Sequence, residues 1–119
     1  MDNYKKACIY GIKCNTTNEI YIGSTYNKLN VRLGKHLTDM RGYLCINKKH
    51  RNYRSSFEVL FNDNYEIFKI EDWPCNNREE LHMREGMYIY KYWKEIVNKR
   101  LPVRREVLEK HLNHSFSLI

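Results

Sequence analysis

The chain has few of the residues that interrupt or cross-link a fold, with two prolines, five glycines and four cysteines among 119 residues. The cysteines, Cys8, Cys14, Cys45 and Cys75, lack C-x-x-C spacing and are too few to staple a chain of this size. We therefore expect reduced packing residues, and neither a disulfide framework nor a zinc site. No apolar run approaches the length of a membrane span, and the polar residues 1–6 do not begin a signal peptide. These absences predict an intracellular, non-secreted protein with no membrane partner.

Acidic residues are also outnumbered, because 14 Asp and Glu face 21 Lys and Arg and give a formal net charge of +7. A cationic surface attracts phosphates regardless of sequence, so charge alone favours nucleic acid as the partner, with an anionic membrane surface as the other polyanion. The connection 41–54 interleaves basic residues with tyrosines, which suits phosphate contacts and base stacking, although most charge runs are solvated loops. Contacts with a nucleic-acid backbone are predicted for Lys48, Lys49, Arg51, Arg54, Lys99 and Arg100.

The segments 7–14 and 19–25 have the pattern of a β-hairpin. Both are rich in β-branched and aromatic residues, and the four short polar residues between them suit a tight turn. If this turn closes the hairpin, Tyr10 lies opposite Gly23, and Tyr21 shares its face of the sheet. Gly23 would then leave room at Tyr10 for a ligand or another side chain.

Residues 28–41 are predicted to form a helix with one apolar side. Apolar residues recur there at helical spacing, at Leu29, Leu33, Leu37 and Met40. His36 falls within this apolar stripe, and Arg32 lies one turn earlier at its edge. An arginine and a histidine are therefore expected on the side of the helix that faces the core.

The remaining segments predict an α/β fold of the α+β type. A short helix is expected at 55–62, a third strand at 65–73, a long helix beginning near Arg78, and a short basic helix at 103–111. The chain has no internal repeat and no linker-like stretch, so its length predicts a single domain, 1–119. Its centre would be a three-stranded antiparallel sheet flanked by helices.

Glu85 is the most informative residue of the long helix. On a helical wheel it lies in the middle of an apolar stripe formed by Leu81, Tyr88, Ile89, Tyr92 and Ile96. A buried carboxylate without a cation is costly, so either Arg32 or a metal ion is expected beside it. An ion pair with Arg32 would be structural, whereas a metal ion would mark a functional site.

In their order and spacing, these motifs resemble the GIY-YIG nuclease family over residues 7–98. The matching motifs are Cys8-Ile9-Tyr10, Tyr21-Ile22-Gly23, the R-x-x-x-H segment 32–36, Leu81-His82-Met83-Arg84-Glu85, and Asn98. The chain departs from the family at the first triplet, where Cys8 replaces a glycine. Asn98 matches an asparagine close to the family's active site, although an asparagine after a helix is also a common C-cap. Residues 99–119 match none of these motifs and form a basic C-terminal extension.

The resemblance implies a metal-dependent DNA endonuclease that hydrolyses phosphodiester bonds. Glu85 would hold one divalent ion, Mg²⁺ or Mn²⁺, since a single carboxylate leaves the other ligand positions to waters and phosphate oxygens. Arg32 would clamp the scissile phosphate. Tyr10 would act as the base, with His36 hydrogen-bonding to it or relaying its proton, and Tyr21 would position the phosphate or the water.

The base is the least determined of these roles. A free phenol is ionised only to roughly one part in a thousand near pH 7, so cationic neighbours must lower its pKa or a partner must take its proton. Arg32 and His36 are such neighbours. Two other assignments are open: the roles of Tyr10 and Tyr21 reversed, or His36 itself as the base, because an ordinary histidine has a pKa of about 6.5.

Two other classes of function are also open. One is a nucleic-acid-binding module that keeps the fold without cleavage, and the other is a structural protein with an Arg32–Glu85 ion pair in its core. Too few residues lie outside 7–98 for a separate DNA-binding domain. Target choice would then need a homodimer, a separate specificity partner or recognition of DNA structure.

Overall fold

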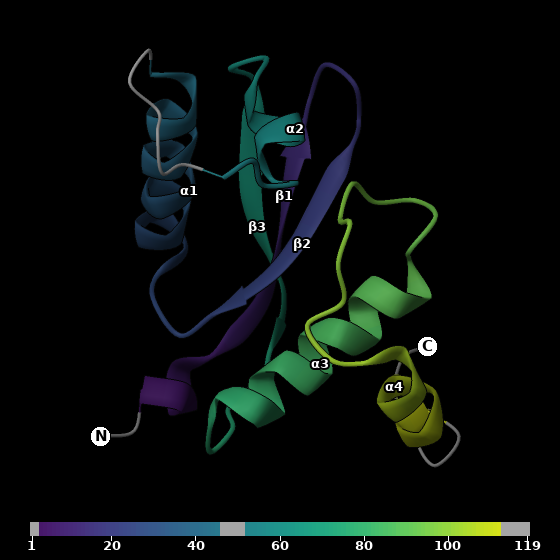
Figure 1. The fold of residues 1–119 in the computed structure, drawn as a ribbon. Helices are drawn as coiled ribbons and strands as arrows, with labels where there is room; N and C mark the ends of the chain where they lie inside the picture. The colour runs from purple at the N-terminus through teal and green to yellow at the C-terminus, as the bar shows by residue number, and fades with distance from the viewer. Residues whose placement is uncertain (1–2, 46–51, 113–119) are drawn as a thin grey trace.

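The computed structural model describes residues 3–45 and 52–112. In chain order its elements are η1 (Asn3–Lys6), β1 (Cys8–Cys14), β2 (Ile20–Thr25), α1 (Leu29–Leu44), α2 (Phe57–Leu60), β3 (Tyr65–Asp72), α3 (Arg78–Lys91) and α4 (Arg105–Leu112). Figure 1 shows α1 and α2 near one end of the sheet and α3 and α4 near the other. The predicted α+β architecture, with its hairpin, third strand and flanking helices, is confirmed. None of the described helices is long and apolar enough to cross a membrane.

β1 is the central strand of an antiparallel sheet with the order β2-β1-β3. The predicted hairpin register is confirmed, because Tyr10 pairs with Gly23 and Ile12 pairs with Tyr21. Asn18 closes the turn in the left-handed region, with a φ of 65°, which asparagine tolerates better than most residues. Cys8 has no such unusual backbone: among the described non-glycine residues only Asn18 and Asp63 have positive φ. A cysteine therefore fits the strand at this position.

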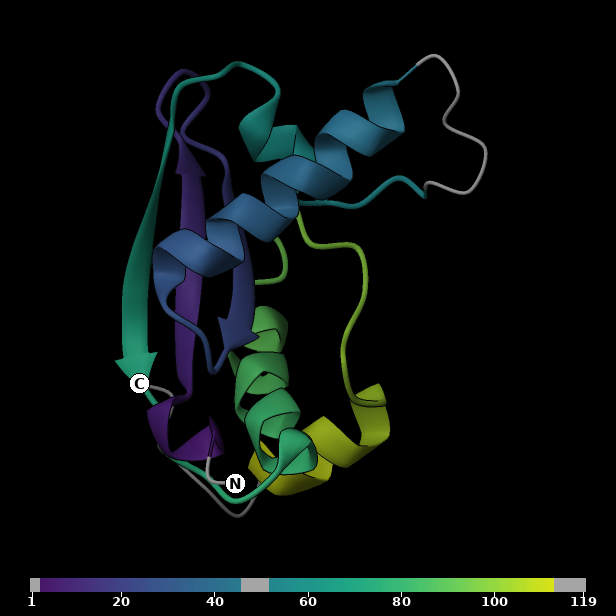
Figure 2. The ribbon, with the colours of Figure 1, turned by 90° about the vertical axis from the view of Figure 1, so that its left-hand side faces the viewer.

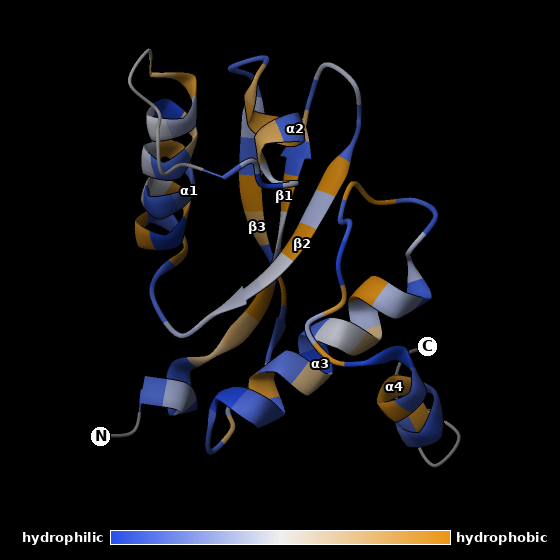
Figure 3. Ribbon diagram, in the orientation of Figure 1, coloured by the Kyte–Doolittle hydropathy of each residue, from blue (hydrophilic) through white to orange (hydrophobic). Residues whose placement is uncertain are grey.

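Side chains alternate between two hydrophobic clusters, one on each face of the sheet. Tyr10 and Ile12 pack on one face with residues of α1 and α2, whereas Ile9 and Ile22 pack on the other face with residues of α3. Figure 2 shows α1 crossing the sheet on the side toward the viewer, and Figure 3 shows hydrophobic and polar residues alternating along β2. Because β2 is an edge strand, groups from both faces can meet beside it.

The long helix is shorter than its pattern predicts. α3 ends at Lys91, and Tyr92 leaves helical geometry with φ −105° and ψ 20°. Tyr92 is therefore exposed, and it does not continue the apolar stripe as predicted. The chain turns so that the backbone N–H of Val97 donates to the carbonyl of Ile20 over 2.9 Å. This segment therefore hydrogen-bonds to the otherwise unpaired edge of β2. A helix continued to Ile96 could not offer that backbone N–H to the strand.

A partly buried ion pair that the sequence analysis missed joins α3 to β3. Arg84 is only 5% exposed and binds the Glu71 carboxylate through two nitrogens, at 2.7 and 3.0 Å. Tyr88 donates to the same carboxylate over 2.9 Å. The Arg84 guanidinium also stacks over the Trp73 ring, 4.3 Å from its centroid. The hydrogen bonds from Arg84 lower the pKa of Glu71. Together these contacts fix how α3 lies against the sheet.

Replacing Gly23 with alanine should displace Tyr10 and destabilise the protein. A Cβ atom at Gly23 would lie 2.5 Å from the Tyr10 hydroxyl oxygen and 2.6 Å from its Cζ. Tyr10 has no exposed surface and cannot swing aside. We expect the free energy of unfolding to fall by about 1–3 kcal/mol, as overpacking commonly causes, measured by urea denaturation.

Gly34→Ala is the matched control, because Gly34 lies in the exposed part of α1 with no atom within 4 Å of the added Cβ. This variant should be more stable than the wild type by about 0.5–1 kcal/mol, since alanine is the better helix former. A Gly23→Ala protein as stable as the wild type would contradict the packing of Tyr10 against Gly23.

Candidate active site

Tyr10, Arg32 and His36 form one hydrogen-bonded group on the α1 side of the sheet. The Tyr10 hydroxyl oxygen lies 2.6 Å from Nε2 of His36, and Arg32 donates from Nε to the same oxygen over 3.0 Å. On the other side of the imidazole, Nδ1 of His36 lies 2.9 Å from Oγ of Ser56, the residue that precedes α2. The arginine and histidine predicted to face the core thus both meet the first tyrosine.

Burial keeps Tyr10 and His36 uncharged in the free protein. Burial, reinforced by the Arg32 guanidinium, lowers the pKa of His36 to about 3. Burial and the neighbouring Tyr21 raise the pKa of Tyr10, although Arg32 acts against this shift. The expectation that cationic neighbours lower the pKa of this phenol is wrong for the free protein, because desolvation outweighs one guanidinium and His36 is neutral.

The hydrogen bonds nevertheless direct the Tyr10 proton. A guanidinium has no acceptor, so the Tyr10 oxygen accepts from Arg32. When the imidazole carries its own proton on Nδ1, the single proton of Tyr10 points to Nε2 of His36. Tyr10 therefore has a partner that can receive its proton, which was the other condition for a tyrosine base.

Tyr21 lies beside this group and nearer to solvent. Its ring centroid is 5.4 Å from that of His36, with the two planes at 74°. Tyr21 is partly exposed and lines a hollow of about 950 Å³, whereas Tyr10 lies beneath the residues that line it. Burial and the Glu85 carboxylate raise the pKa of Tyr21 to about 12. The second tyrosine is thus the phenol that borders the hollow.

Glu85 reaches the same hollow from α3, on the opposite face of the sheet. Its carboxylate accepts a hydrogen bond from the Ser24 hydroxyl on β2, and burial raises its pKa despite Ser24 and Arg32. Among the ion pairs of the described residues, none joins Glu85 to Arg32. Arg32 lies close enough to influence the charge of Glu85, but its Nε is taken by Tyr10. The alternative of a structural Arg32–Glu85 pair therefore has no support in the geometry.

The donor set around Glu85 suits a hard divalent cation. A carboxylate and a hydroxyl supply oxygen ligands, and the hollow leaves space for waters and phosphate oxygens. Within residues 3–45 and 52–112, no group of three or more His, Cys, Asp or Glu side chains could hold a metal ion by itself. Such a site fits Mg²⁺ or Mn²⁺, which are often bound by one or two carboxylates together with substrate phosphates.

Asn98 fastens the loop after α3 to the edge of β2. Its Oδ1 accepts from the Ile22 N–H over 2.9 Å, and its Nδ2 donates to the Ile22 carbonyl over 2.8 Å. The Asn98 amide thus makes the two hydrogen bonds with the Ile22 backbone that a paired strand would otherwise make. Asn98 lies seven residues beyond the end of α3, so it is not the C-cap of that helix.

Basic side chains surround the hollow. Of the predicted nucleic-acid contacts, Arg54, Lys99 and Arg100 line it, whereas Lys48, Lys49 and Arg51 lie outside the described residues. Lys35 from α1 and Arg78 from the start of α3 also line it, and the sequence analysis had assigned them no role. Arg54 contacts Asp39 at 3.6 Å, but both groups are partly solvated. The hollow therefore carries positive charge from four separate parts of the chain.

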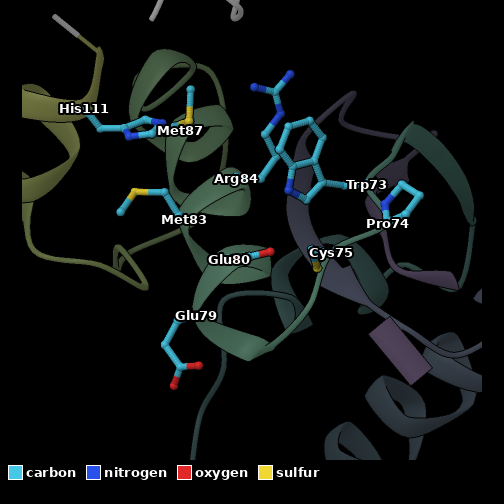
Figure 4. Close-up of a pocket in the computed structure, with 9 residues that line it drawn as sticks. All are labelled: Trp73, Pro74, Cys75, Glu79, Glu80, Met83, Arg84, Met87 and His111. Carbon is cyan, nitrogen blue, oxygen red and sulfur yellow. The ribbon is translucent and has the colours of Figure 1, made fainter. Parts of the chain in front are cut away.

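A second hollow, of about 560 Å³, borders another face of α3. It is lined by Trp73, Pro74, Cys75, Glu79, Glu80, Met83, Arg84, Met87 and His111, and Figure 4 shows the Arg84 guanidinium beside the Trp73 ring. None of the residues predicted for the site lies there. Tyr21, Arg32, His36, Glu85 and Asn98 line the basic hollow instead.

Sequence reasoning did not identify Ser24 or Ser56. Ser24 follows the Tyr21-Ile22-Gly23 motif, and strand alternation places its side chain on the α3 face with Ile22. The sequence could therefore have predicted a contact between Ser24 and the long helix. Ser56 had no comparable signal, because its contact with His36 depends on how α2 packs against α1.

The fold and the site together define a class of small α+β domain in which polar groups from both faces of a sheet meet in a basic hollow. The family model described as the GIY-YIG catalytic domain matches residues 6–112, nearly the whole chain. The chain belongs to this family, whose domains are nucleases in general. Searches of curated proteins and of solved structures gave no match.

His36 should stay neutral across physiological pH and make the protein less stable in acid. A histidine in an unfolded chain titrates near 6.5, whereas His36 in the folded protein titrates near 3. Between these values the unfolded state binds more protons. The free energy of unfolding should therefore fall as the pH drops from about 6.5 towards 3, by up to about 1.4 kcal/mol per pH unit.

His36→Gln isolates this contribution from those of the carboxylates. Urea denaturation of both proteins at pH 7, 6 and 5 should show the wild type losing stability more steeply than the variant. Equal slopes would contradict a neutral, buried His36.

Proposed function

We propose that this nuclease domain is a metal-dependent DNA endonuclease that hydrolyses phosphodiester bonds in the basic hollow. One observation carries the proposal: the Tyr10–His36–Arg32 group and Glu85, which has no ion-pair partner among the described residues, approach one hollow from opposite faces of the sheet. Hydrolysis of a phosphodiester needs a cation for the phosphate, an acceptor for the proton of water, and help for the leaving oxygen. This hollow contains candidates for each part.

Arg32 is proposed to bind the scissile phosphate. Its Nε donates to Tyr10, so the position of the guanidinium is fixed before substrate arrives. Within the described residues, no hydrogen bond takes up its terminal amino groups, and Arg32 lines the hollow. Those groups can donate to phosphate oxygens in the planar geometry that arginine provides.

Glu85 is proposed to hold one Mg²⁺ or Mn²⁺ ion, with the Ser24 hydroxyl orienting its carboxylate. When bound, the ion would act as a Lewis acid toward the phosphate. Burial of Glu85 without a cation raises its pKa, which is the electrostatic condition that a divalent ion would relieve.

Tyr10 and His36 are proposed to act as one unit in accepting the proton of water. When Tyr10 takes a proton from the attacking water, its own proton passes to Nε2 of His36. The low pKa of His36 opposes this transfer in the free protein. An anionic phosphate bound at Arg32 would offset the guanidinium charge and so favour the imidazolium. Tyr21, at the border of the hollow, would hold the water or the phosphate in place.

The basic residues that line the hollow are proposed to bind the DNA backbone on either side of the cleaved bond. Arg54 lies on the segment that leads into α2, whereas Lys99 and Arg100 directly follow Asn98. Contacts of this kind attract DNA without reading its sequence, and their strength falls steeply with salt. One site cuts one strand at each encounter, so cleavage of both strands would need a second copy or a second binding event.

Glu85→Gln should strongly slow cleavage and stabilise the fold. The amide keeps the size of the side chain and can still accept from Ser24, but it removes a charge that burial disfavours. With supercoiled plasmid and Mg²⁺, we expect the wild type to produce nicked circles first, EDTA to stop the reaction, and the variant to be slower by about a hundredfold or more. The same variant should unfold at a higher temperature.

Glu79→Gln, on the exposed first turn of α3, is the matched control and should cleave at the wild-type rate. A Glu85→Gln protein that cleaves normally would overturn the metal assignment, and one that is less stable would support the structural reading of Glu85. Plasmid retarded at low salt but uncut with Mg²⁺ and Mn²⁺ would identify a binding module instead.

A double-mutant cycle tests whether Tyr10 and His36 act together. Tyr10→Phe and His36→Gln should each slow cleavage by about 10²–10⁴-fold, the usual contribution of acid–base catalysis. The double variant should be no slower than the slower single variant, because either change already breaks the shared proton path.

Multiplicative losses in the double variant would show that the two residues act independently. If Tyr21→Phe lost the activity while Tyr10→Phe kept it, the two tyrosine roles would be reversed. All four variants should be compared at the same DNA saturation, so that weaker binding is not read as slower chemistry.

A further inference from the structure

Ser56 is a buried polar residue for which the family resemblance gives no role. It is 1% exposed and stands at the N-cap position of α2, where a serine side chain normally accepts a hydrogen bond from the first turn of the helix. Here the side chain makes no such bond, and its Oγ lies 2.9 Å from Nδ1 of His36. The Ser56 hydroxyl thus hydrogen-bonds to the imidazole and not to a backbone N–H in the first turn of α2.

We propose that Ser56 is a positioning residue that holds His36 in the tautomer with its proton on Nδ1, so that Nε2 stays open to the Tyr10 proton. A neutral imidazole carries one proton on one of its two nitrogens, and the hydrogen bond at one nitrogen decides the state of the other. Ser56 meets Nδ1, and Tyr10 meets Nε2. This role rests on the proposed function of the Tyr10–His36 unit.

The shorter of the two bonds favours this direction. The contact between the Tyr10 oxygen and Nε2 is 2.6 Å, which is below the usual range of an N–H donor and within that of a hydroxyl donor, and the contact of 2.9 Å between Nδ1 and Oγ is compatible with an N–H donor. In the opposite arrangement, the Tyr10 oxygen would accept from both Arg32 and His36. Its own proton would then have no partner, because Tyr10 has no exposed surface in the free protein, and an unpaired buried donor is costly.

The consequence concerns the rate of the proton step and not the binding of DNA. Without the Ser56 oxygen, Nδ1–H loses its acceptor, and the tautomer with its proton on Nε2 becomes populated. That tautomer cannot receive the Tyr10 proton. Since Ser56 Oγ faces the imidazole, its loss should lower kcat and leave KM nearly unchanged.

The tautomer can be measured directly, without DNA. In protein labelled with ¹⁵N at histidine, two-bond correlations from the ring protons distinguish a protonated from an unprotonated nitrogen, and His36→Gln identifies which signal belongs to His36. At pH 7, we expect the wild type to show a protonated Nδ1 and an unprotonated Nε2. Ser56→Ala should show a mixture or the reverse.

Cleavage of the supercoiled plasmid supplies the second readout. Ser56→Ala should lower kcat by about tenfold, in line with the loss of one buried hydrogen bond, and Ser56→Thr, which keeps the hydroxyl, should retain the wild-type tautomer. Thr38→Ala, which removes an exposed hydroxyl from α1, is the control and should change neither readout.

A wild-type His36 with its proton on Nε2, or a folded Ser56→Ala protein with an unchanged tautomer, would overturn the inference. These outcomes are separate from failure of the proposed function. The tautomer is read in the free protein, so a chain that cuts no DNA still reports on Ser56. An unchanged tautomer in an active enzyme would overturn the role of Ser56 alone.

Discussion

Tyr10 is fully buried in the middle of the sheet, and a buried phenol must find hydrogen-bond partners inside the protein. Much of the site follows from this requirement. Arg32 and His36 meet the Tyr10 oxygen from successive turns of α1, which fixes that helix against the sheet. His36, buried in turn, requires a partner for its second nitrogen and finds Ser56. Among the described residues, no buried side-chain nitrogen or oxygen lacks a hydrogen-bond partner.

The second half of the site depends on the edge of β2. The Tyr21 side chain packs on the α1 side of the sheet, where Gly23 lies against Tyr10, whereas the Ser24 side chain contacts Glu85 on the α3 side. Asn98 and Val97 close the free edge of the strand and thereby bring the basic segment 99–100 beside the hollow. On the α3 side of the sheet, the Arg84–Glu71 ion pair holds α3 in position. Groups that lie far apart in sequence thus converge at one strand edge, where neither face of the sheet excludes solvent completely.

Helical periodicity was reliable in α1 but only partly so in α3. The pattern of α1 correctly placed His36 in the core, because residues of this helix from Leu29 to Met40 pack on the cluster that contains Tyr10 and Ile12. In α3 the same reasoning placed Tyr92 and Ile96 on the stripe of Glu85, although the helix ends before them. It also missed Arg84, which is buried and pairs with the partly exposed Glu71. A helical wheel assumes a continuous helix with one buried side, whereas α3 packs against both β2 and α4.

The sequence by itself determined the hairpin register, the inward face of α1 and the family. Each depends on neighbouring residues: a short polar turn sets the strand pairing, and side-chain periodicity sets the face. Only the tertiary structure decided what surrounds each polar group. The Glu85 carboxylate meets a serine 61 residues away and not Arg32, and Asn98 binds the backbone of Ile22 across 76 residues. Burial also reversed the expected pKa shift of Tyr10. Such contacts depend on how separate elements pack, and local pattern carries no information about distances between them.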